Sequence, residues 1–149
     1  MIPMVEKILF LKGVELFERI PAEELSLISS ITEEVYLSPE EPVFLEGDDG
    51  DALYLVVDGT VRVHSGDRVI GEMGEGECFG EMAILDTEPR SASVTTQNDV
   101  VLLQISREDF SELLYEKPEI SRGVILVLTQ RIREINRKKR KPAKKAGTK

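Results

Sequence analysis

The chain has 149 residues, enough to bury a core without disulfide or metal support, and its single cysteine excludes an internal disulfide. Its net charge of −9 is unevenly spread: residues 137–149 carry eight basic and no acidic side chains, which leaves 11 basic and 28 acidic residues, a balance of −17, in residues 1–136. That acidic body is unlike a nucleic-acid-binding surface, and no apolar stretch is long enough for a signal peptide or a transmembrane helix. We therefore expect one cytoplasmic domain, in which binding of any anion must depend on local geometry.

Residues 1–30 are predicted to be helical. Val5, Ile8 and Leu9 follow helical spacing, and Gly13 is expected to end this first helix. Pro21 then begins a second short helix, because proline is tolerated in the first helical turn.

Residues 31–105 are predicted to form strands. Short runs of β-branched and aromatic residues alternate with glycine, proline and aspartate. Asp58-Gly59 lies between two such runs and predicts a β-hairpin, because this pair accepts the positive φ angles of a tight turn. Many short strands at this spacing are typical of closed β folds, so we predict a mainly β protein, a jelly-roll-like β-roll of about eight strands.

Residues 106–136 are predicted to return to helix. Ser106 precedes two acidic residues of a first turn and is expected to be an N-cap, and Pro118 begins a last helix with one apolar side. Residues 137–149 lack apolar periodicity, so we expect the domain to end at 136 and a basic, disordered tail to follow. Such a tail is suited to weak contact with anionic lipid or nucleic acid.

The segment 74–93 contains the groups that point to a function. At Gly80 a strand is expected to give way to a short helical turn, whose unpaired N–H groups suit a phosphate. Gly80 lets the backbone approach closely, and Arg90 supplies a planar, permanently charged fork for phosphate oxygens. Glu81 repels phosphate, but its carboxylate can accept hydrogen bonds from sugar hydroxyls. The segment therefore contains groups for both halves of a cyclic ribose phosphate.

Phe79-Gly80-Glu81-Met82-Ala83-Ile84, five intervening residues and Arg90-Ser91-Ala92 resemble the phosphate-binding cassette of cyclic-nucleotide-binding domains. That family includes bacterial catabolite activators, regulatory subunits of cAMP-dependent kinase and nucleotide-gated channels. The resemblance covers roughly residues 14–136 and includes the upstream run Phe44-Leu45-Glu46-Gly47-Asp48. Glu41 departs from the family, which often has glycine in that turn.

The resemblance implies a role for each matched residue of the cassette. Glu81 would bind the ribose 2′-hydroxyl, and Arg90 would pair with the cyclic phosphate. The Ser91 side chain and the backbone N–H groups of Ala83 and Ala92 would complete the phosphate cradle.

Further residues are matched around the ribose and the base. Gly80 and Met82 would line the ribose side, while Val63 and Met73 would form the apolar wall near the base. The last helix would act as a lid that covers the purine, with the matching positions Arg131, Ile132, Ile135 and Asn136.

By this resemblance the chain is expected to be a non-enzymatic sensor that binds cAMP, or else cGMP, without a cofactor and moves its last helix when it does so. Ser91 excludes neither base. The expected partners are a regulated effector domain or protein and a second copy bound through the last helix. One alternative is a protein-interaction module that keeps the fold without using nucleotide. Sequence-specific DNA binding is not expected, because only a basic tail follows the last helix.

Other chemistry finds little support in the residues. The acidic run 48–51 lacks the ligand spacing and closing glutamate of an EF-hand, and His64 is the only histidine, so no metal site is expected. Cys78 is expected to be part of the core. No nucleophile and base can be paired convincingly, which argues against an enzyme.

Overall fold

The structure is a computed structural model that describes residues 1–147. Within these residues the strands form two four-stranded antiparallel sheets, ordered β1-β8-β3-β6 and β2-β7-β4-β5. The strands are β1 Thr32–Leu37, β2 Pro42–Phe44, β3 Ala52–Asp58, β4 Val61–Ser65, β5 Arg68–Met73, β6 Cys78–Phe79, β7 Ser93–Thr96 and β8 Val100–Ser106. The predicted mainly β fold is confirmed, and the strand expected to end at Gly80 is the two-residue β6.

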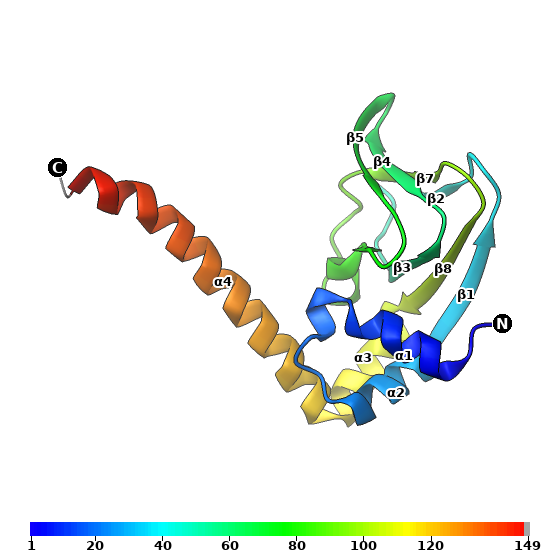
Figure 1. Ribbon diagram of the computed structural model, residues 1–149, viewed down its shortest axis with the longest axis horizontal. Helices are drawn as coiled ribbons and strands as arrows, with labels where there is room; N and C mark the ends of the chain where they lie inside the picture. Colours follow the sequence, from blue (N-terminus) through cyan, green and yellow to red (C-terminus); the bar gives the residue numbers. More distant parts are fainter. Residues whose placement is uncertain (148–149) are drawn as a thin grey trace.

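Helices cover one end of this β-roll (Figure 1). They are α1 Met4–Lys12, η1 Glu15–Phe17 and α2 Ala22–Ser30 before the strands, η2 Glu81–Ile84 between β6 and β7, and α3 Arg107–Glu116 and α4 Pro118–Gly147 at the end. Phe17 of η1 and Phe110 of α3 are buried together, with ring centres 5.7 Å apart. The predicted N-cap of α3 is confirmed, because the Ser106 hydroxyl accepts a hydrogen bond from the N–H of Asp109 at 3.1 Å.

The strand β3 separates two hydrophobic cores. Leu53 and Leu55 point into the core shared with the helices, whereas Tyr54 and Val56 point into the core between the two sheets. Successive side chains of a strand point to opposite faces, so a strand buried on both faces must be apolar throughout. This explains the unbroken apolar run of β3 and its central place in the fold.

The turn at Asp58-Gly59 forms, but the predicted hairpin is wrong. Gly59 has a φ of 90°, as a tight turn requires, yet β3 and β4 belong to different sheets and do not pair. β3 pairs with β6 and β8, and β4 pairs with β5 and β7. An Asp-Gly pair specifies the local reversal of the chain, whereas strand pairing is decided by which faces can be buried.

The turn before β2 accommodates the departure at Glu41. Its left-handed residue is Glu40, with a φ of 61°, and not Glu41. The N–H of Glu41 donates to Thr96 Oγ1 at 2.8 Å, so the turn is tied to β7. Glycine is therefore not needed at position 41.

The last helix does not end where the sequence analysis placed its end. α4 continues past Asn136 to Gly147, and its C-terminal half extends away from the body (Figure 1). Arginine, lysine and alanine are strong helix formers, although Pro142 is not, so the loss of apolar periodicity removes only the signal for packing. The last two positions of the basic segment lie outside the described residues, and its expected disorder stays a prediction.

Candidate functional site

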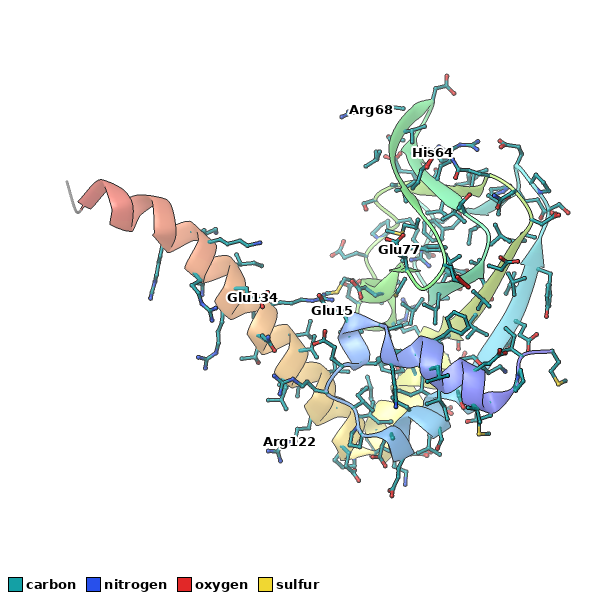
Figure 2. All side chains as sticks on the ribbon, viewed as in Figure 1. Glu15, His64, Arg68, Glu77, Arg122 and Glu134 are labelled. Atoms are coloured by element: carbon teal, nitrogen blue, oxygen red, sulfur yellow. The ribbon has the colours of Figure 1, made fainter. Side chains whose placement is uncertain are left out.

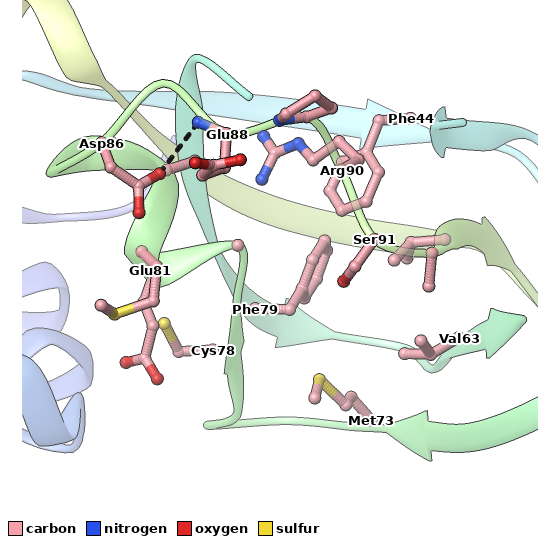
Figure 3. Close-up of a pocket in the computed structure, with 16 residues that line it drawn as sticks. Phe44, Val63, Met73, Cys78, Phe79, Glu81, Asp86, Glu88, Arg90 and Ser91 are labelled. Carbon is pink, nitrogen blue, oxygen red and sulfur yellow. Dashed lines mark hydrogen bonds between the residues drawn. The ribbon is translucent and has the colours of Figure 1, made fainter. Parts of the chain in front are cut away.

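A cavity of about 440 Å³ opens in the β-roll beside η2 (Figure 3). This volume is within the usual range for small-molecule sites. Its lining includes every predicted cassette residue, Gly80, Glu81, Met82, Ala83, Arg90, Ser91 and Ala92, together with the predicted wall residues Val63 and Met73. The structure thus brings both groups to one cavity, while their roles toward a ligand stay predictions.

Gly80 marks the point at which β6 ends and η2 begins. Its φ of 73° lies in the left-handed region, and a Cβ there would lie 2.5 Å from Arg90 Nη1. The positive φ and the close approach of Arg90 both favour glycine at this position. The N–H of Ala83 donates to the Gly80 carbonyl at 3.0 Å, so this predicted phosphate donor is already engaged. Among the described residues no hydrogen bond involves the N–H groups of Met82 and Ala92, which are available donors at the cavity.

Arg90 is a buried cation with an aromatic floor. Only 8% of the residue is exposed, and its guanidinium carbon lies 4.0 Å from the centre of the Phe44 ring. Nη2 donates to the Ala52 carbonyl at 2.8 Å, whereas Nε is buried without a hydrogen-bond partner among the described residues. Burial lowers the pKa of Arg90, although an arginine so placed still carries its charge.

No carboxylate forms an ion pair with Arg90 within the part of the chain that the structure describes. A buried charge is costly unless it is paired and hydrogen-bonded. Because the guanidinium faces a cavity large enough for a small molecule, an anionic ligand would supply the missing partner.

Glu81 lies across the cavity from Arg90 and is held by the last helix. Arg131 Nη2 donates to Glu81 Oε1 at 3.3 Å, and Arg131 Nη1 lies 3.9 Å from the Met82 sulfur. Partial burial by itself lowers the pKa of Arg131, but the charges and hydrogen bonds of Glu81 and Glu15 raise it on balance. Arg131 is therefore the predicted lid residue that the structure brings to the cassette.

The other predicted lid residues lie away from the cavity. Ile132 and Ile135 are 59% and 54% exposed on α4, Asn136 is exposed as well, and none of the three lines the cavity.

Seven lining residues were missed by the assignment of the site from the sequence: Phe44, Cys78, Phe79, Asp86, Glu88, Pro89 and Val94. Phe44 was noted only as part of a matched run, and Cys78, expected in the core, is half-buried beside the cavity. Burial raises the pKa of the Cys78 thiol, and the nearby Glu81 carboxylate adds to the rise. Phe44 stacks on Arg90 from a strand 46 residues away, a cation–π contact that neither local sequence marks.

The composition of the cavity wall suits binding. Val63, Met73 and Phe79 supply apolar side chains, and the charged lining residues are Arg90 and, apart from it, Glu81, Asp86 and Glu88 (Figure 3). Among the described residues no three His, Cys, Asp or Glu side chains are grouped to hold a metal ion, and no helix is long and apolar enough to cross a membrane.

The family model of the cyclic nucleotide-binding domain matches residues 34–117. The cyclic AMP receptor protein of Thermus thermophilus is 38% identical over 129 residues, which are 83% of this chain and 60% of that protein. A cAMP-dependent protein kinase regulatory subunit of Eremothecium gossypii is 32% identical over 111 residues, 70% of this chain and 24% of that subunit. The chain thus spans 60% or less of the length of these curated relatives.

Solved structures with a similar fold also match this chain. The N-terminal domain of a transcriptional regulator from Streptomyces coelicolor has a TM-score of 0.81 and 29% identity, with 85% of this chain and 94% of that chain covered. The regulatory domain of Toxoplasma gondii PKA, crystallised with cAMP, has a TM-score of 0.70 and 28% identity over 74% of this chain and 44% of that chain.

Proposed function

Because the chain belongs to the cyclic nucleotide-binding domain family, we propose that its cavity binds a purine cyclic nucleotide, with cAMP preferred over cGMP, as the input of a cytoplasmic sensor. The observation that carries this proposal is the buried guanidinium of Arg90, which forms no ion pair among the described residues and lines a cavity together with the carboxylates of Glu81, Asp86 and Glu88. A cyclic phosphate would pair with the Arg90 guanidinium, and a ribose 2′-hydroxyl would donate a hydrogen bond to the Glu81 carboxylate. This chain's proposed role is binding and not catalysis.

The phosphate is proposed to pair with Arg90. The Ser91 hydroxyl and the amides of Ala83 and Ala92 donate to the remaining phosphate oxygens. Since the Ala83 amide already donates to the Gly80 carbonyl, binding must share or replace that bond. Hydrogen bonds from a charged donor are the stronger ones, so Arg90 supplies most of the anchoring.

The sugar and the base are proposed to occupy the other side of the cavity. Glu81 accepts a hydrogen bond from the ribose 2′-hydroxyl, while Gly80 and Met82 line the sugar. Val63 and Met73 pack against the purine. The preference for cAMP rests on the cyclic AMP receptor protein of Thermus thermophilus, which is 38% identical, whereas a cGMP-dependent protein kinase of Toxoplasma gondii is 35% identical. Ser91 is compatible with either base.

We also propose that nucleotide binding moves α4 over the cavity. In the structure only Arg131 of its predicted lid residues reaches the cassette, so closure would bring Ile132, Ile135 and Asn136 toward the purine. The nucleotide favours the closed arrangement only to the extent that it binds that arrangement more tightly.

The proposed partner of α4 is a second copy of the chain, with an effector domain or protein receiving the signal. Ile125, Leu128, Ile132 and Ile135 lie on one side of the helix with the three-four-three spacing of a coiled-coil seam. Three of these four are exposed in the single chain. A parallel or antiparallel pair of α4 helices would bury them.

Calorimetric titration with cAMP, cGMP and AMP side by side tests the proposed ligand. We expect saturable binding of cAMP, weaker binding of cGMP, and the weakest binding of AMP, whose open phosphate does not fit a cradle shaped for the ring. No heat with either cyclic nucleotide at millimolar concentration would overturn the proposal and favour an interaction module that does not use nucleotide.

A further inference from the structure

The guanidinium of Arg131 joins three segments that are distant in the sequence. Its Nε donates to Glu15 Oε1 at 2.6 Å, and its Nη2 contacts both Glu15 Oε1 and Glu81 Oε1. Glu15 belongs to η1, Arg131 to α4 and Glu81 to η2. Figure 2 shows Glu15 at the point where α4 leaves the body. One cation therefore links the N-terminal segment, the last helix and the carboxylate that faces the cavity.

The two carboxylates do not hold Arg131 equally. The contacts to Glu15 are the shorter ones and use two nitrogens of the guanidinium, whereas Glu81 is bonded through one nitrogen at 3.3 Å. Both contacts end on the single oxygen Oε1 of Glu15, and they tie the edge of the planar guanidinium that carries Nε and Nη2 to that oxygen. Glu15 therefore sets the direction from which Arg131 reaches Glu81.

This contact determines which oxygen of Glu81 faces a ligand. Arg131 bonds Oε1, and no hydrogen bond to Oε2 occurs among the described residues. Arg131 also offsets the negative charge of Glu81, which would otherwise repel a nearby phosphate. A carboxylate that is held at one oxygen and partly neutralised can present the other oxygen to a hydroxyl.

We propose that Glu15, which lies outside the cavity, is a positioning residue for the ribose: it fixes Arg131, and Arg131 in turn orients the Glu81 carboxylate toward the 2′-hydroxyl. The proposal rests on the proposed nucleotide function and adds the N-terminal segment to the site. It also gives η1 a route by which its docking against α4 affects ligand affinity.

Isothermal titration of the Glu15→Gln variant with cAMP and 2′-deoxy-cAMP tests this proposal. Partly exposed ion pairs contribute modestly, so we expect cAMP binding to weaken by about two- to five-fold, with unchanged binding of 2′-deoxy-cAMP. A general loss of folded protein would weaken both ligands alike, so the ratio of the two affinities isolates positioning. The matched control is Glu18→Gln, which removes the same charge three residues later, where no hydrogen bond or ion pair with Arg131 occurs among the described residues.

A second variant, at Arg131, tests the same link between Glu15 and Glu81. Arg131→Lys keeps the charge but cannot bond two carboxylates through a rigid fork. It should reduce the preference for cAMP over 2′-deoxy-cAMP to the same extent, and adding Glu15→Gln to it should change nothing further. This variant also carries the test if Glu15→Gln does not fold.

The outcomes separate this proposal from the proposed function. Wild-type protein that binds neither nucleotide would overturn both. Wild-type protein that prefers cAMP over 2′-deoxy-cAMP, with the same preference in Glu15→Gln, would overturn the role of Glu15 and leave the nucleotide site intact. Equal binding of the two nucleotides by the wild type would also overturn it, since Glu81 would then not act on the 2′-hydroxyl.

Discussion

The guanidinium carbon of Arg90 lies 4.0 Å from the centre of the Phe44 ring, so the cation of the cavity is stacked on an aromatic face. Phe44 itself packs against Phe79, with ring centres 5.9 Å apart, and Phe79 stacks on Tyr54 at 5.3 Å. The hydrogen bond from Nη2 to the Ala52 carbonyl fixes one end of the fork. Arg90 is thus positioned by an aromatic cluster and one carbonyl, and no ion pair within the described residues contributes.

Replacing Arg90 by alanine should weaken cAMP binding by roughly 2–5 kcal/mol, the usual loss when one partner of a desolvated charge pair is truncated. Titration calorimetry measures the effect, and thermal unfolding verifies that the variant folds. Arg68→Ala is the matched control, because Arg68 is exposed on β5 (Figure 2) and lies outside the cavity lining. Equal affinities of wild type and Arg90→Ala would remove Arg90 from the site.

Replacing Gly80 by alanine should abolish tight nucleotide binding, because the added methyl would lie 2.5 Å from Arg90 Nη1. Gly76→Ala provides a control with the same backbone cost: Gly76 also has a positive φ, 85°, but no atom lies within 4 Å of the new methyl. Both variants should lose stability by about 1–2 kcal/mol from left-handed strain, and only Gly80→Ala should lose affinity. Similar affinities in the two variants would show that the close approach does not matter.

The pKa of Cys78 leads to a pH prediction. Burial raises it above the ordinary value of 9.0, so above that pH the unfolded chain loses a proton that the folded chain retains. The unfolded state then binds fewer protons, and stability must fall as pH rises through this range. Thermal unfolding between pH 8 and 10 should show a steeper loss in the wild type than in Cys78→Ala. Parallel curves would mean that the thiol ionises normally in the folded protein.

The exposed seam on α4 leads to a prediction about assembly. Ile132→Glu places a charge in the centre of the seam and should convert a dimer into a monomer in sedimentation experiments, because a buried unpaired charge is strongly unfavourable. Arg133→Glu, one residue away and off the seam, should leave the dimer intact. A wild-type chain that is monomeric at every concentration tested, with and without cAMP, would contradict the proposed pairing.

The sequence was most informative where a local pattern has one structural solution. The apolar run of β3 and the Ser106 N-cap follow from side-chain alternation and from hydrogen bonding within four residues. The cassette residues of segment 79–92 were likewise placed in one cavity, because they lie close together in the chain.

The features that sequence reasoning missed depend on contacts between distant positions. The hairpin expected at Asp58-Gly59 does not form, because β3 and β4 belong to different sheets. Glu15 and Arg131 are 116 residues apart, and nothing in either local sequence marks them as partners. The course of α4 beyond Asn136 was missed as well, because helix propensity without an apolar face gives no packing signal.

A crystal structure of the protein with saturating cAMP tests the central claim most directly. We expect the cyclic phosphate within hydrogen-bonding distance of the Arg90 guanidinium and the ribose 2′-hydroxyl on the Glu81 carboxylate, with the purine against Val63 and Met73. A nucleotide bound elsewhere, or an empty cavity at saturating concentration, would contradict it.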